Sequence, residues 1–469
     1  MGFKWFPWHF IVRHIARSQG FLDPVALLAR LRRFAQPSEV GEPIELLRAG
    51  MVFHARGLIN SRAIQHNLDW VWPYWIVRQF DHNDESFIPR AFSITHVNLS
   101  HRNWTAVGWP DLDQYPIVDP RGLLTPLYDG WSLDCWLIGD DGNRLLPSQC
   151  LNSLQHISFD QGPEVVTETQ VTGMKLTTLA TVKLDHGQPY CLLQVEAHSD
   201  QPGWLAIALR PCNPEGVSFI HEVRLDRNHW WVNGEPCMRL STTPERHCAS
   251  DYHGGDVALH LPDQGEKDRI SCEVGMATAA ALYRIEGGKN RQIEVTIPLK
   301  TEQQAMLHPN AWQEELDKSC HLEIPDDHIR FLYETALSTL ILHSPGEAFP
   351  GPYTYRRFWF RDAAFIVHGL LCAGLTERAE RVLDLFPARQ DHSGYFHSQE
   401  GEWDANGEVL WIMHRFGELT GQPLIGLLLH RRIPPPWALR AGGGTQVPWY
   451  TGTGDRRGKG TGVTELQRQ

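Results

Sequence analysis

The residue types best suited to chemistry gather in one aromatic and charged stretch, which includes Tyr355, Trp359, Arg361 and Asp362. A carboxylate accepts hydrogen bonds from sugar hydroxyls, a guanidinium donates to them, and an indole covers the apolar face of the ring. Together these types can bind a neutral polyol. The sequence leaves a second interpretation open, in which Asp362 caps a helix and Arg361 pairs locally.

A second cluster holds Glu402, Trp403, Asp404 and Glu408, just ahead of a helical pattern. Its carboxylates could act as a general acid and base. Asp404 is also a good helix N-cap, and a glutamate in a first turn suits the helix dipole, so capping is the stronger interpretation from pattern alone.

Metal and cofactor chemistry is not expected. The nearest approach to a metal site is His247, Cys248 and His253, whose spacing matches no recognised ligand set. A glycine-rich run near Lys459 lacks the spacing of a phosphate-binding loop. The sequence therefore predicts neither a metal nor a nucleotide.

Composition narrows the classes of partner and compartment. The chain has 469 residues, with 43 Lys and Arg against 55 Asp and Glu, a net charge of −12 that argues against nucleic-acid binding. Nine cysteines without a C-x-x-C pair favour reduced thiols and hence the cytoplasm. We expect no signal peptide and no membrane-spanning segment. The oligomeric state stays open.

Hydrophobic periodicity divides the chain before any likeness is considered. Residues 1–50 are expected to be helical and basic, and 51–300 to form one antiparallel β-sandwich of strands and short turns. A linker, 301–324, precedes a helical domain over 325–424. The tail, 425–469, carries seven basic and two acidic residues with proline and glycine triplets, which is typical of disorder. The fold class is thus a β-plus-α multidomain protein.

Two motifs resemble a known family. Tyr353–Gly374 resembles the W-x-R-D-A segment of bacterial glucoamylase-like and trehalase-like six-hairpin glycosidases, and Glu402–Ile412 is similar to their Q-x-D-x-x-G-E-V-L helix start. These enzymes place a β-sandwich and a helical linker before an (α/α)6 toroid. The resemblance implies an oligosaccharide or glucoside as ligand.

The same resemblance assigns roles to the first cluster. Trp359 would line the floor of the −1 sugar subsite, Arg361 and Asp362 would bind hydroxyls of the non-reducing sugar, and Tyr355 would flank the ring. We expect Asp362 to lie in a concave site with Trp359 and Trp403.

In the second cluster, the resemblance makes Asp404 and Glu408 supports of the subsite wall. Glu402 stands where the family usually has glutamine. It counts as a further supporting residue.

The helical domain departs from the family. Residues 325–424 predict four helices, where a toroid needs twelve, so we expect an incomplete toroid in a truncated or frame-shifted chain, with Ile412 and Phe416 exposed. The family hydrolyses α-glucosidic bonds with inversion by two carboxylates. Its acid and base lie downstream of the G-E-V-L helix, where this sequence has no equivalents, so the catalytic residues are unknown. The hypotheses are a glycoside hydrolase-like protein without activity, or a non-catalytic carbohydrate-binding protein or pseudoenzyme fragment.

Overall fold

A computed structural model describes residues 59–60, 62–64, 66–84, 104–159, 161–214, 216–263, 266–299, 307–353, 356–392, 394–398 and 402–422. The expectations for 1–50 and 425–469, and the site residue Tyr355, fall outside these residues.

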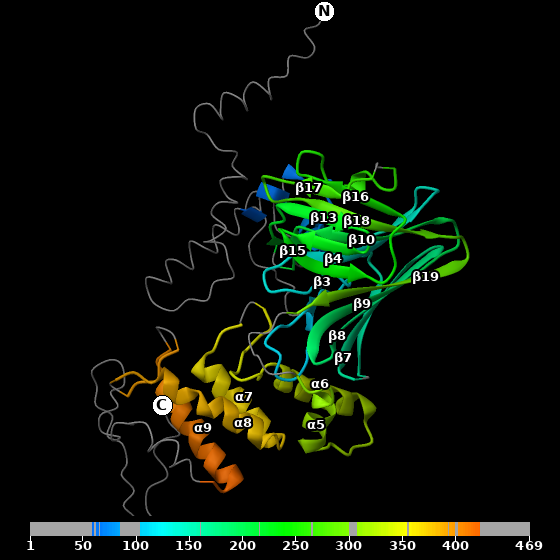
Figure 1. Cartoon of the computed structure of the whole chain (residues 1–469). Helices are drawn as coiled ribbons and strands as arrows, with labels where there is room; N and C mark the ends of the chain where they lie inside the picture. Colours follow the sequence, from blue (N-terminus) through cyan, green and yellow to red (C-terminus); the bar gives the residue numbers. More distant parts are fainter. Residues whose placement is uncertain are drawn as a thin grey trace, which may run out of the picture.

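The first of two large sheets has eight strands among the described residues, all paired antiparallel (Figure 1). Their order is β1-β2-β3-β4-β10-β18-β16, with β5 beside β4. The strands are β1 (Thr105–Ala106), β2 (Ile117–Val118), β3 (Leu124–Thr125), β4 (Ser132–Gly139), β5 (Arg144–Leu145), β10 (Gly203–Arg210), β16 (Arg246–Ser250) and β18 (Thr278–Ile285).

The second sheet has nine described strands, also antiparallel, in the order β17-β13-β14-β15-β19-β9-β8-β7-β6. They are β6 (Ser153–Phe159), β7 (Pro163–Val171), β8 (Met174–Asp185), β9 (Gln188–Ser199), β13 (Glu222–Asp226), β14 (His229–Val232), β15 (Glu235–Leu240), β17 (Arg269–Ser271) and β19 (Lys289–Pro298). A separate pair consists of β11 (Cys212–Asn213) and β12 (Gly216–Val217).

The turns between these strands follow from their residues. His186 and Gly187 join β8 to β9 with positive φ values of 48° and 77°, and Asn233 and Gly234 join β14 to β15 at 52° and 84°. Two consecutive left-handed residues match the right-handed twist of a hairpin. The predicted antiparallel pairing is confirmed here.

Burial explains why the sheets stack. Strand β8 alternates buried and half-buried residues over most of its length, as expected of a sheet with one face in the core. Strand β4 is buried along its whole length. A second apolar cluster, which includes Val71, Trp136 and Val257, covers the other face of the first sheet.

Helices fill positions before, between and after the strands. They are α4 (Tyr74–Phe80), α5 (Ala311–Lys318), α6 (Asp327–Leu342), α7 (Phe360–Cys372), α8 (Thr376–Asp384) and α9 (Ala405–Thr420), with 3-10 turns η4 (Pro147–Gln149), η5 (Val257–Leu259) and η6 (Phe386–Arg389).

One sequence expectation is wrong in detail. The region after residue 51 does not hold strands alone, because α4 follows Pro73 directly, and the first described strand begins at Thr105. Trp75 and Ile76 read as strand formers, but both are buried on a helix, so packing outweighs their β-propensity. The expected linker 301–324 contains α5, whose Trp312 is buried.

Helices α7 and α9 pack side by side with their N-termini at the same end (Figure 1). Further along the pair, Phe365 and His368 of α7 contact the Trp411 ring of α9, with ring centroids 5.5 and 5.2 Å apart. The expectation that Ile412 and Phe416 are exposed is wrong, because both are buried in the core. The exposed apolar residues of this pair are instead Phe365, Leu410 and Leu419.

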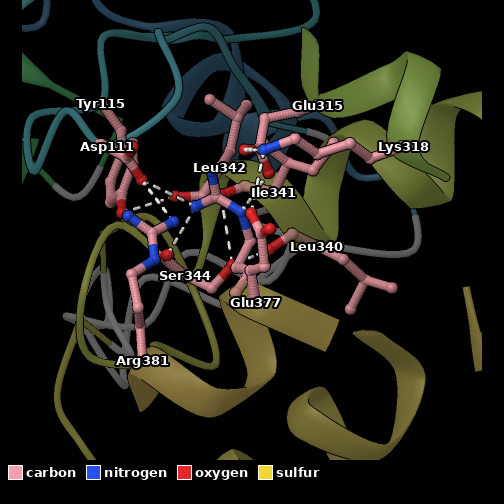
Figure 2. A network of polar contacts seen from close by, with 11 residues as sticks. Asp111, Tyr115, Glu315, Lys318, Leu340, Ile341, Leu342, Ser344, Glu377 and Arg381 are labelled. Atoms are coloured by element: carbon pink, nitrogen blue, oxygen red, sulfur yellow. Dashed lines mark hydrogen bonds and ion pairs between the residues drawn. The ribbon is translucent and has the colours of Figure 1, made fainter. Parts of the chain in front are cut away.

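A buried arginine joins the strand and helical parts. Arg378 of α8 donates from Nε to Glu315 of α5 (2.8 Å) and from Nη1 to Asp111 (2.9 Å) and the Ser344 carbonyl (2.7 Å). Figure 2 shows Asp111, from the loop between β1 and β2, in one network with Glu315 and Ser344. Arg381, at an exposed position, also contacts the carboxylate of Asp111. One side chain therefore ties four segments together.

In the part of the chain that the structure describes, no helix is both long and apolar enough to cross a membrane. All nine cysteines lie in described segments and none forms a disulfide.

Candidate functional site

The two sequence clusters meet at the N-terminal ends of α7 and α9. Arg361, in the first turn of α7, donates from Nε to Asp404 Oδ2 (2.7 Å) and from Nη2 to Asp404 Oδ1 (2.9 Å). Such a two-point pair fixes the plane of the guanidinium as well as its distance. Both side chains are nearly half exposed, at 46% and 43%. The pair therefore lies at the surface, within reach of a ligand.

Glu402 lies beneath this pair and is buried, with 2% of its surface exposed. Its Oε1 accepts the backbone N–H of Arg361 at 2.9 Å, and its Oε2 accepts the hydroxyl of Ser398. The Tyr395 hydroxyl donates to the Glu402 carbonyl at 3.0 Å. Both carboxylate oxygens thus have donors, which a buried charge requires.

The helix-capping interpretation is wrong for Asp362. The N-cap of α7 is Trp359, and Asp362 is the third helical residue. Asp404 does occupy the N-cap position of α9, but its side chain makes no capping hydrogen bond. Its carboxylate binds Arg361 instead. Arg361 thus pairs across the two clusters rather than locally.

The four carboxyl groups have different pKa values because their surroundings differ. Arg361 lowers the pKa of Asp404, chiefly through the two-point hydrogen bond. Burial raises the pKa of Asp362, against the opposing charge of Arg361. Burial also raises the pKa of Glu402 and of Glu408, and nearby Asp404 raises both further. Neither Asp362 nor Glu408 forms an ion pair with a described residue.

Aromatic residues adjoin these groups in the sequence. Trp403 is 69% exposed beside Asp404, and Trp359 is half-buried at the start of α7. Phe358, Phe360 and Phe386 pack edge to face, with ring centroids 5.0 to 5.6 Å apart, and anchor the segment that carries Trp359. The concave site expected around Asp362 stays a prediction.

A hollow of about 590 Å³ lies elsewhere, at the start of α8. It is lined mainly by charged side chains that pair with one another, including Glu315, Lys318, Glu377 and Arg378. None of the candidate site residues lies in it, although Gly374, at the end of the first motif, does.

The described residues contain no group of three side chains able to hold a metal ion. His247 is nearly buried, with Nδ1 3.6 Å from Asp268, and its ring packs against Trp230. Burial lowers its pKa. These contacts are those of a histidine that packs within the fold.

Sequence reasoning missed the loop that holds the second cluster. Tyr395 and Ser398 hold Glu402, and the Asn406 side chain accepts the N–H of Phe396 at 2.9 Å. The available signal was a run of hydroxyl and amide residues just ahead of a helix, a composition that supports turns and caps.

Comparisons with known proteins give a fold and no close relative. No family model matches the chain, and no curated protein matches it. A bacterial glucoamylase solved with acarbose matches at a TM-score of 0.50 and 10% identity, over 70% of this chain and 58% of that chain. The chain resembles the six-hairpin glycosidases in fold. At this identity the likeness shows the fold alone.

Two further solved structures match more loosely. A protein from the human microbiome named as a kojibiose phosphorylase has a TM-score of 0.38 and 9% identity, over 67% of this chain and 49% of that chain. A family GH92 α-mannosidase from Bacteroides thetaiotaomicron has a TM-score of 0.28 and 10% identity, over 51% of this chain and 37% of that chain. The chain spans less than two thirds of the length of the solved glucoamylase.

Proposed function

We propose that this chain is a glycoside hydrolase-like protein that binds the non-reducing end of an α-glucosidic oligosaccharide where α7 and α9 begin. The observation that carries the proposal is the Arg361–Asp404 pair, which joins two polar and aromatic clusters 43 positions apart in the sequence. Their meeting creates one surface with carboxylates, a guanidinium and indoles, the groups that bind sugar hydroxyls and ring faces.

Each group has a separate task in this proposal. Asp362 and Glu408, without ion-pair partners among the described residues, accept hydrogen bonds from sugar hydroxyls. Arg361 uses Nε and Nη2 on Asp404, so Nη1 is left to donate to a hydroxyl. Trp403 and Trp359 offer ring faces. Because Asp404 pairs with Arg361 while Asp362 and Glu408 add carboxyl groups, the surface does not suit an anionic ligand.

The wider organisation is part of the same proposal. The β-sandwich over 51–300, the linker over 301–324 and a partial (α/α) toroid over 325–424 would place the sugar site at one end of the helices. Cytoplasmic residence is proposed because none of the nine cysteines forms a disulfide. The fold match to a glucoamylase solved with acarbose supports the choice of ligand class.

Hydrolysis is the second candidate, favoured by one observation. The pKa of Asp362 and of Glu408 is raised, the direction expected of a group that must hold a proton near neutral pH. An inverting glycosidase needs two carboxyl groups roughly 6.5–9.5 Å apart. Turnover of an aryl α-glucoside, lost in Asp362→Asn or Glu408→Gln, would support hydrolysis over binding alone.

Binding of acarbose to the purified full chain, measured by isothermal titration calorimetry, tests the proposal. We expect saturable binding that weakens at least about tenfold in Asp362→Asn and in Trp403→Ala, each of which loses a hydrogen bond or stacking face. Phe365→Ala is the matched control, because Phe365 is also an exposed aromatic residue on this helix pair. Absent binding, or equal losses in all three variants, would refute the proposal.

A further inference from the structure

The N-terminus of α7 lacks a cap from its own sequence. Its N-cap residue, Trp359, makes no side-chain capping hydrogen bond, because an indole carries a donor and no acceptor. The first N–H groups of a helix need acceptors from elsewhere. Glu402, from the loop before α9, accepts the second of them, the N–H of Arg361, at 2.9 Å. A residue 41 positions away thus performs the capping task.

Glu402 and Asp404 hold the same residue at two points. Glu402 binds the backbone of Arg361, and Asp404 binds its guanidinium. An arginine side chain loses roughly 1.5–2 kcal/mol of rotamer freedom when it is fixed. Here that loss occurs on folding, so a ligand meets an arginine that is already oriented.

The contacts of Glu402 exclude direct contact with a ligand. Only 2% of the surface of Glu402 is exposed. Each of its carboxylate oxygens already accepts a hydrogen bond, one from Arg361 and the other from Ser398. Arg357 holds the Ser398 carbonyl at 3.3 Å, which fixes the loop further. A negative charge at this point also complements the positive end of the α7 dipole.

We propose that Glu402 is a positioning residue that caps α7 from an outside loop and thereby fixes Arg361 and Asp362 for ligand binding. The ligand part rests on the proposed function, whereas the capping part does not. What the position requires is an acceptor at Oε1. Glutamine keeps that acceptor, and its amide can donate to the Ser398 hydroxyl, which accepts as well as donates.

The test compares the full-length wild type with Glu402→Gln and Glu402→Leu. Hydrogen exchange of the amides in the first turn of α7 measures the effect of the cap, with the amides of α8 as internal reference. Calorimetry with acarbose measures whether Arg361 and Asp362 are positioned for binding. In Glu402→Leu we expect exchange in the first turn of α7 to rise at least about fivefold, and acarbose binding to weaken by a similar factor. Glu402→Gln should restore both.

A third variant keeps the test decisive if Glu402→Leu fails to fold. Ser398→Ala removes one donor to Glu402 and leaves the Arg361 contact, so we expect a smaller rise in exchange confined to the same turn. Unchanged exchange in Glu402→Leu, or Glu402→Gln behaving like Glu402→Leu, would overturn the cap. Faster exchange in Glu402→Leu with unchanged acarbose affinity would show that Glu402 does not position residues for ligand binding. Absence of acarbose binding in the wild type would instead refute the proposed function, and exchange alone would then decide the cap.

Discussion

Arg361 and Asp404 form a two-point ion pair, with 2.7 Å between Nε and Oδ2 and 2.9 Å between Nη2 and Oδ1, that joins the starts of two parallel helices. The pair occupies the carboxylate of Asp404, which could otherwise cap α9, and two of the N–H donors of Arg361. It therefore ties ligand recognition to the packing of α7 on α9.

Replacement of Asp404 by asparagine should separate stability from binding. Both partners are nearly half exposed, so we expect the free energy of unfolding to fall by no more than about 1 kcal/mol. Acarbose affinity should fall about tenfold or more, because Arg361 is no longer held in one plane. Urea denaturation and calorimetry on the same preparation measure the two effects. A large loss of stability with unchanged affinity would make the pair purely structural.

Arg378 should be the most sensitive position of the network in Figure 2. The Arg378 side chain is 1% exposed, and Arg378→Met removes its bonds to Asp111, Glu315 and the Ser344 carbonyl. Among the described residues, Asp111 then keeps only its contact with Arg381, and Glu315 only a longer one, 3.9 Å, with Lys318. We expect a loss of roughly 3–5 kcal/mol in unfolding free energy. Arg381→Met, at an exposed position on the same Asp111, should lose about 1 kcal/mol or less. Equal losses would show that burial does not set the difference.

Asp119 should make stability depend on pH. Burial raises the pKa of this carboxyl group to about 7, and its Oδ1 accepts the N–H groups of Arg121 and Leu123. The folded state therefore binds a proton that the unfolded state releases. Its contribution to stability is complete below about pH 4 and is lost as pH rises through 7.

Asp119→Asn tests this dependence by urea denaturation from pH 5 to 8. Over that range the wild-type unfolding free energy should fall more steeply than that of the variant, by at most about 1.4 kcal/mol per pH unit. Asp134, whose pKa burial raises to about 6, adds a slope of the same sign that both proteins keep. Asp185→Asn, at an exposed turn, should leave the slope unchanged. Parallel curves for wild type and Asp119→Asn would contradict the assignment.

Two glycines of α9 should respond in opposite ways to alanine. Gly421 ends the helix in the left-handed conformation, with φ of 70°, so Gly421→Ala should lower stability by about 1 kcal/mol. Gly407 lies inside the helix with open space at its Cβ position, so Gly407→Ala should raise stability by roughly 0.5–1 kcal/mol. Thermal denaturation of both variants checks the signs. A shared sign would show that backbone conformation does not govern the effect.

Local signals in the sequence predicted much of the fold. The Asn233-Gly234 turn and the Gly421 helix stop are encoded by a few neighbouring residues, and both occur in the structure. Burial is a property of the whole fold, which is why α4 and the covered positions Ile412 and Phe416 were mispredicted.

The candidate site was only partly accessible to the same reasoning. The residue types in the sequence indicated that the clusters containing Arg361 and Asp404 could bind a ligand. No local sequence pattern predicts that these two residues pair with each other. Asp404 looked like a helix cap because its position suits one, and the long-range contact to Arg361 took precedence over the cap. The outside cap from Glu402 is likewise a contact between distant segments.

A crystal structure of the full chain grown with acarbose would show directly whether the sugar binds where α7 and α9 begin. We expect a sugar ring against Trp403, with its hydroxyls within hydrogen-bond distance of Asp362 and of Nη1 of Arg361. Acarbose bound instead in the hollow lined by Lys318 and Glu377, or crystals grown at saturating acarbose with no sugar at the starts of α7 and α9, would contradict it.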